Sequence, residues 1–191
     1  MRITPLLTLS ALLLTACGTT TGALQKDNLK NPLYAAQYYA DLTERMVNLE
    51  LQKDPVTKDA RKKAIIDQTR KNGVANEQRA ASVKAQGQEG TFVSDSGLVR
   101  GEVLLLKHTL FFGVDFAAVP GPELHVFVST VLDPRDVRFP DSTAVDLGPL
   151  PDVFGAQSMS IAETADLSKM RSAVLHDVKL GQMYGFAQLS K

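Results

Sequence analysis

Short apolar runs of strand length follow one another through the second half of the chain, and most of them end in Gly, Pro or Asp. The clearest run follows a Pro-Gly-Pro break and alternates between two faces, with Leu124, Val126 and Val128 on one and His125, Phe127 and Ser129 on the other. Seven similar runs surround it, at residues 90–93, 98–106, 110–119, 144–150, 159–162, 171–178 and 183–189. Short runs at this spacing predict an antiparallel sandwich or barrel. We expect residues 87–191 to form a β-sandwich, so that the fold is mainly β.

A helical pattern precedes this region. Asn31-Pro32 has the residue types of an N-cap followed by a first-turn proline. Apolar residues then recur at helical spacing, at Tyr34, Tyr38, Leu42, Met46 and Leu49. We expect this first helix to end near Gln52.

A second start signal occurs at Asp54-Pro55 and predicts another helix, which we expect to end at Asn72-Gly73. Its apolar stripe is weaker and consists of Val56, Ala60 and Ala64. The two helices predict a helical hairpin within a segment of residues 31–86. Residues 76–86 fit either a third, mostly polar helix or an unstructured stretch. The sequence leaves open whether the hairpin packs on the sandwich or stands apart from it.

Residues 1–16 have the layout of a secretory signal peptide, with Arg2 before an apolar core of eleven residues. This core is shorter than the roughly 20 residues needed to span a bilayer. The segment ends in Leu-Thr-Ala-Cys-Gly at residues 14–18 and resembles the bacterial lipobox. The resemblance implies cleavage before Cys17 and acylation of Cys17, for example with palmitate. Residues 17–30 would then be the lipidated Cys and a flexible tether.

Localisation and partners follow from the same segment and from the charge. Gly18 follows Cys17, and by resemblance to sorting rules in diderm bacteria this implies the outer membrane of the cell envelope. We expect a lipid bilayer as partner through Cys17, and an envelope protein as a further partner. The formal net charge is zero, which gives no indication of nucleic-acid binding. Charge is unevenly divided, however, with a net +4 over residues 23–86 and a net −5 over residues 87–191.

A run of basic residues lies in the expected hairpin, at Lys58, Arg61, Lys62, Lys63, Arg70 and Lys71. It fits either a solvated helix face or contact with anionic lipid headgroups.

The second half of the chain resembles a known family in the order and spacing of several motifs. These are Gly90-Thr-Phe92, Val99-Arg-Gly101-Glu-Val103, Asp115-Phe116, Pro122 to Ser129, Asp146 to Leu150, Gly155-Ala-Gln157 and Phe186 to Leu189. They resemble the DM-thirteen domain, which is called the electron transfer DM domain and is related to DOMON domains. The resemblance implies a β-sandwich in an extracellular or membrane-attached protein. It also implies a redox role that rests on a Cys after an aromatic residue in a late strand.

This chain departs from that pattern at the working position. His176 stands at the aromatic position and Asp177 at the Cys position, while Met159 replaces a Tyr expected after the Gly-Ala-Gln motif. The only Cys in the chain is Cys17, and a carboxylate cannot replace a thiolate as an electron carrier. We therefore expect a non-catalytic binding or interaction module without a cofactor, which is not an enzyme.

Two alternatives remain open. The first is a redox domain that binds haem or a transition metal through His125, Met159, His176 and Asp177, if distant strands bring these side chains together. The second is an envelope hydrolase, although no Ser lies in a Gly-x-Ser-x-Gly motif.

Overall fold

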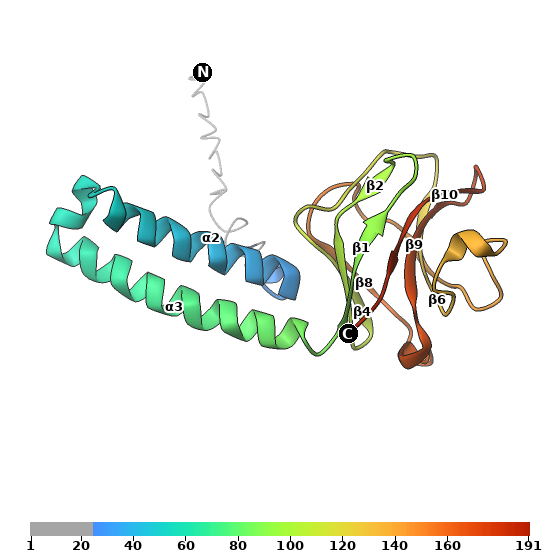
Figure 1. Cartoon of the computed structure of the whole chain (residues 1–191), viewed down its shortest axis with the longest axis horizontal. Coiled ribbons are helices and arrows are strands. Elements are labelled where there is room, and N and C mark those ends of the chain that lie inside the picture. Colours follow the sequence, from blue (N-terminus) through green and yellow to red (C-terminus); the bar gives the residue numbers. More distant parts are fainter. Residues whose placement is uncertain (1–24) are drawn as a thin grey trace, which may run out of the picture.

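The computed structural model describes residues 25–191. The expected signal peptide, Cys17 and the beginning of the tether lie outside these residues. The described chain forms a helical hairpin followed by an antiparallel β-sandwich (Figure 1), which confirms the predicted fold class. Within residues 25–191, no helix combines the length and the apolar character that crossing a membrane requires.

The first long helix, α2 (Pro32–Leu51), begins where its capping signal predicts. Asn31 Oδ1 accepts hydrogen bonds from the backbone N–H groups of Leu33 (3.0 Å) and Tyr34 (3.4 Å), and Pro32 occupies the first turn. Residues 25–28, which we expected to belong to the flexible tether, instead form a helical turn. Gln25 Nε2 donates to Tyr38 Oη at 2.6 Å, and this contact holds the turn against α2.

A short 3₁₀ turn, η1 (Pro55–Lys58), connects α2 to α3 (Ala60–Lys84), which is one continuous helix. The predicted helix end at Asn72-Gly73 is therefore wrong, and residues 76–84 continue α3. The predicted stripe was also wrong, since Ala60 and Ala64 are exposed. Ile66, Gly73 and Ala80 are the buried residues of α3, at a spacing of seven that keeps one side of the helix against α2.

Eight strands form one antiparallel sheet in the order β7-β6-β9-β10-β1-β3-β4-β8. Their bounds are β1 Gln88–Val93, β3 Glu102–Leu106, β4 Thr109–Phe112, β6 Leu124–Ser129, β7 Val145–Pro149, β8 Gln157–Ser160, β9 Ser172–Asp177 and β10 Gln182–Gln188. Strand β1 joins the two layers of the sandwich, because residues 88–91 pair with β3 and residues 92–93 pair with β10. Two further strands, β2 (Val99–Arg100) and β5 (Ala117–Ala118), pair with each other.

Two of the predicted strands are each divided into two. The first, at residues 98–106, is interrupted at Gly101, whose φ is +117° and whose ideal Cβ position lies 2.5 Å from the Cα of Phe116. Only glycine combines this conformation with such a close approach. The second, at residues 110–119, is interrupted by the turn at residues 113–116 that brings Phe116 to Gly101.

The hairpin packs on the sandwich at one end, and its other end projects away from the strands (Figure 1). Leu33 of α2 packs with Leu104 and Leu106 on the outer face of β3, whereas Val103 and Leu105 face the core between the layers. Asn31 Nδ2 also donates to the carbonyl oxygen of Phe112 at 2.8 Å. Strand β3 is thus buried on both faces, which explains its unbroken run of apolar residues.

Candidate functional site

The structure brings His125 and His176 together on the outer face of the sandwich. Strands β6 and β9 pair in an antiparallel register that places the two histidines directly opposite each other. His125 Nδ1 lies 2.8 Å from Asp146 Oδ2 on β7, and His125 Nε2 lies 3.6 Å from Glu123 Oε1. With 16 % of its side chain exposed, His125 stands between two carboxylates at the edge of this face.

His176 is more deeply covered, with 4 % of its surface exposed. Its ring meets those of Phe127 and Phe139 edge-on, at centroid distances of 6.1 Å and 5.4 Å. Its Nδ1 atom is buried and has no hydrogen-bond partner among the described residues. Burial lowers the pKa of His176, and the charge of Asp177 opposes this only in part. This environment favours a neutral imidazole that packs among aromatic rings.

Asp177 lies on the opposite face of β9, inside the sandwich, and is fully buried. Its Oδ1 atom accepts hydrogen bonds from the backbone N–H groups of Lys179 and Leu180, both at 3.0 Å, and so caps the turn between β9 and β10. Its Oδ2 atom has no partner among residues 25–191. An ideal Cβ at Gly121 would lie 2.6 Å from this Oδ2 and 2.5 Å from Tyr184 Oη, so the three groups are packed closely.

Tyr184 is the polar neighbour of the buried carboxylate. Burial raises the pKa of the Tyr184 hydroxyl, and the charge of Asp177 adds to this effect. The hydroxyl therefore stays protonated at neutral pH. The pair is a polar element inside the core, where Asp177 is 0 % exposed.

Met159, the remaining candidate ligand, lies on β8 opposite Leu110 and is 7 % exposed within the core. The structure therefore does not bring the four candidate ligands into one set, because two lie on the outer face of the sheet and two lie inside it. In the part of the chain that the structure describes, no group of three or more His, Cys, Asp or Glu residues is arranged to hold a metal ion. These residues do not fit a haem or metal site built from His125, Met159, His176 and Asp177.

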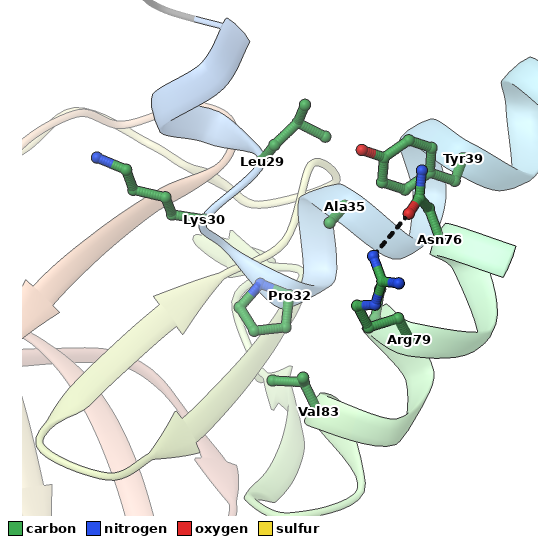
Figure 2. Close-up of a pocket in the computed structure, with 9 residues that line it drawn as sticks. Leu29, Lys30, Pro32, Ala35, Tyr39, Asn76, Arg79 and Val83 are labelled. Carbon is green, nitrogen blue, oxygen red and sulfur yellow. Dashed lines mark hydrogen bonds between the residues drawn. The ribbon is translucent and has the colours of Figure 1, made fainter. Parts of the chain in front are cut away.

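A pocket of about 220 Å³ lies at the base of the hairpin, between the turn that precedes α2 and the last turns of α3 (Figure 2). Its lining comes from three segments and consists of Leu29, Lys30, Pro32, Ala35, Tyr39, Asn76, Arg79, Ala80 and Val83. Most of these side chains are apolar, and Arg79 brings positive charge to the pocket, whereas the amino group of Lys30 points away from it (Figure 2). Arg79 Nη1 donates to Asn76 Oδ1 at 3.0 Å, and Lys30 Nζ lies 2.7 Å from Asp27.

Comparison with protein families identifies the second half of the chain. The family model described as Electron transfer DM13 matches residues 91–189, which is more than half of the chain. The chain belongs to the DM13 family. The DM13 match begins in β1 and ends just after β10, so it covers the sandwich and leaves out the hairpin. It confirms the predicted family resemblance.

A comparison with curated proteins found no match, and neither did a comparison with solved structures. The DM13 assignment therefore gives the family of the chain, whose description is electron transfer. The function of this member has to be inferred from its own residues.

Sequence reasoning missed the pocket at the base of the hairpin. Its signal was present, because Asn76, Arg79 and Val83 follow one another at spacings of three and four, as on one side of a helix. The segment that contains them, however, was left open between a helix and an unstructured stretch. The close packing of Gly121 against Tyr184 had no local signal, since Gly121 precedes β6 and meets Tyr184 of β10 only when both strands pair with β9.

Proposed function

We propose that this DM13 protein is a lipid-anchored protein of the cell envelope whose sandwich is a non-catalytic binding module. The observation that carries the proposal is the position of Asp177. At the place where the family resemblance implies a redox Cys, this chain has a fully buried carboxylate that caps a turn through two backbone N–H groups. A carboxylate cannot cycle between thiol and disulfide, and the only Cys in the chain is Cys17.

The anchor is proposed from the lipobox-like residues 14–18, and an outer-membrane location is proposed from Gly18. Several acyl chains on one Cys would satisfy the requirement of more than one chain for stable anchoring. Cells that express the chain should incorporate labelled palmitate into it, and Cys17→Ser should abolish the label. Label that persists in Cys17→Ser would contradict acylation at this residue. The outer-membrane location is tested separately, by separating inner and outer membranes on a sucrose gradient.

Electron transfer is the alternative that the family description favours, and a spectrum distinguishes it from a binding module. Residues 18–191 retain every residue that the structure describes and would be purified from cells supplied with haem and metals. We expect neither a Soret band nor a stoichiometric metal. A Soret band or a stoichiometric metal that is lost in His125→Ala or His176→Ala would show that the sandwich is a redox domain and not a binding module.

An envelope protein is the partner that we propose for the sandwich. Phe154 supports this, because it is 63 % exposed next to its bridge with Ala117, and aromatic side chains are enriched at protein interfaces. A photo-crosslinking amino acid at position 154 should give a specific adduct in cells, and the same group at position 178 serves as the control. Equal adducts at both positions would argue against a defined contact at Phe154.

A further inference from the structure

The described chain begins on one particular side of the hairpin, which we name the tether face. Gln25 contacts Tyr38 Oη at 2.6 Å, and Leu29 and Lys30 line the same pocket as Arg79 (Figure 2). The first described residues therefore lie over this side of α2 and α3. The tether face consists of Lys30, Tyr38, Tyr39, Arg61, Ile65, Arg79 and Val83.

Residues near both ends of α3 lie on this side of the hairpin, because they are spaced by whole helical turns. Arg61 precedes Arg79 by eighteen residues, and Ile65 precedes Val83 by the same number, which is about five turns at 3.6 residues per turn. Each pair therefore points in one direction. Arg61 and Arg79 are exposed, and none of the ion pairs found within residues 25–191 involves either of them. Ile65, between them on the same side, is 65 % exposed.

The two sides of the hairpin differ in charge. On the other side, a groove of about 460 Å³ between the helices and the sandwich is lined by Glu77, Glu89 and Glu102. The cation in that groove, Lys84, is paired with Glu89 at 3.1 Å. The tether face instead carries Arg61 and Arg79 without carboxylate partners. An anionic surface would thus attract the tether face and repel the opposite side.

We propose that the tether face lies against the anionic phospholipid headgroups of the bilayer that holds Cys17. This inference rests on the proposed lipid anchor. Seven residues separate Cys17 from Gln25, and a fully extended chain over this distance spans at most about 28 Å. Helix α2, with 20 residues, is about 30 Å long. The anchor therefore keeps the tether face within about one hairpin length of the membrane surface.

The chemistry of the face suits lipid headgroups. Guanidinium groups bind phosphate through paired hydrogen bonds, and tyrosines such as Tyr38 and Tyr39 are enriched at membrane–water interfaces. Exposed Ile65 supplies an apolar side chain between the two arginines. Arg61 and Arg79 are about 27 Å apart along α3, at 1.5 Å per residue. One small phosphate compound cannot reach both, whereas a surface of headgroups contacts both at once.

The test uses unlipidated residues 18–191 in sedimentation assays with vesicles. The protein should bind vesicles that contain phosphatidylglycerol at low salt, and bind pure phosphatidylcholine vesicles weakly or not at all. The double variant Arg61→Gln/Arg79→Gln should lower the partition coefficient about thirtyfold, which corresponds to about 1 kcal/mol for each cation. The matched control, Arg100→Gln/Arg171→Gln, removes the same charge from the sandwich and should change binding less than about threefold. Far-UV circular dichroism of both variants verifies that they are folded.

Two results of the vesicle assay would overturn the inference. One is equal binding to both kinds of vesicle at low salt, and the other is an equal loss of binding in the control pair, which would indicate a general effect of net charge. A photo-crosslinker at position 65 that joins the lipidated protein in cells to another protein instead of to lipid would also refute it. The palmitate label on Cys17 is measured separately. A missing label would therefore refute the anchor, and the vesicle experiment judges the tether face independently of that result.

Discussion

Gly73 should be a position at which alanine destabilises the protein, although alanine is the better helix former. Gly73 lies in the interior of α3, where replacing glycine by alanine ordinarily gains about 1 kcal/mol. A Cβ at this position, however, would collide with Thr43 Oγ1 on α2, and it would lie 3.6 Å from Thr43 Cβ. Overpacking of this kind costs about 1 to 3 kcal/mol. The two effects predict that Gly73→Ala lowers the free energy of unfolding by about 1 kcal/mol.

Removal of Thr43 Oγ1 should reverse the sign of the stability change that Gly73→Ala causes. Thr43 Oγ1 is buried and has no hydrogen-bond partner among the described residues, so Thr43→Ala breaks no hydrogen bond. In the Thr43→Ala background, Gly73→Ala should raise the free energy of unfolding by up to about 1 kcal/mol. The expected coupling between the two positions is therefore about 2 kcal/mol, within the range found for residues in contact.

Urea unfolding of the four proteins, followed by the helical circular dichroism signal, measures this coupling. Asn72→Ala in both backgrounds is the control, because Asn72 is exposed on the same helix and should show the same change in each. If Gly73→Ala changes the stability equally with and without Thr43, the two helices do not meet at Gly73. The continuous packing of α3 against α2 would then be refuted.

Three further predictions concern the junction, the buried histidine and the buried aspartate. Asn31→Ala should lower the free energy of unfolding by about 2 kcal/mol because it removes both the cap of α2 and the bond to the Phe112 carbonyl. Asn31→Ser, which retains a capping oxygen, should lose less, and equal losses would contradict the capping role. Burial lowers the pKa of His176, so the unfolded state binds more protons, and thermal stability should fall as the pH drops below about 6.5. In calorimetry between about pH 7 and 5, His176→Phe should flatten this pH dependence, and an unchanged slope would show that another group causes it. The thiol introduced by Asp177→Cys into residues 18–191 should react with Ellman's reagent only as the protein unfolds, whereas that of Val178→Cys, at a position 37 % exposed, should react at once; rapid reaction at both positions would contradict the burial of Asp177.

The strands of the sandwich could be predicted because their signals are local. Alternation along β6 places Leu124, Val126 and Val128 in the core and His125 on the outer face, as the sequence indicated. The capping signal of Asn31 was equally local and correctly placed the start of α2. These features depend only on the backbone geometry of one segment and on which face of that segment meets water.

The end of α3 could not be predicted in this way. Asn72-Gly73 is a common helix-stop sequence, but contact with α2 requires a residue without a side chain at position 73, and this requirement outweighs the stop signal. Similarly, β3 is apolar on both faces because the hairpin covers its outer face through Leu33. In both cases the residue types are explained by a contact with a segment that lies far away in the sequence.

For the candidate site too, the sequence predicted some features and only the structure decided others. The sequence by itself determined that Cys17 is the only Cys in the chain, because this needs only residue identities, and the family resemblance implies that Asp177 stands where a redox Cys is expected. Only the tertiary structure decided that Asp177 and Met159 lie inside the sandwich while His125 and His176 lie outside it, because strand register sets which side chains meet. It also decided that Arg61, Arg79 and the start of the described chain share one side of the hairpin. Helix phase and long-range packing bring together residues that are far apart in the sequence.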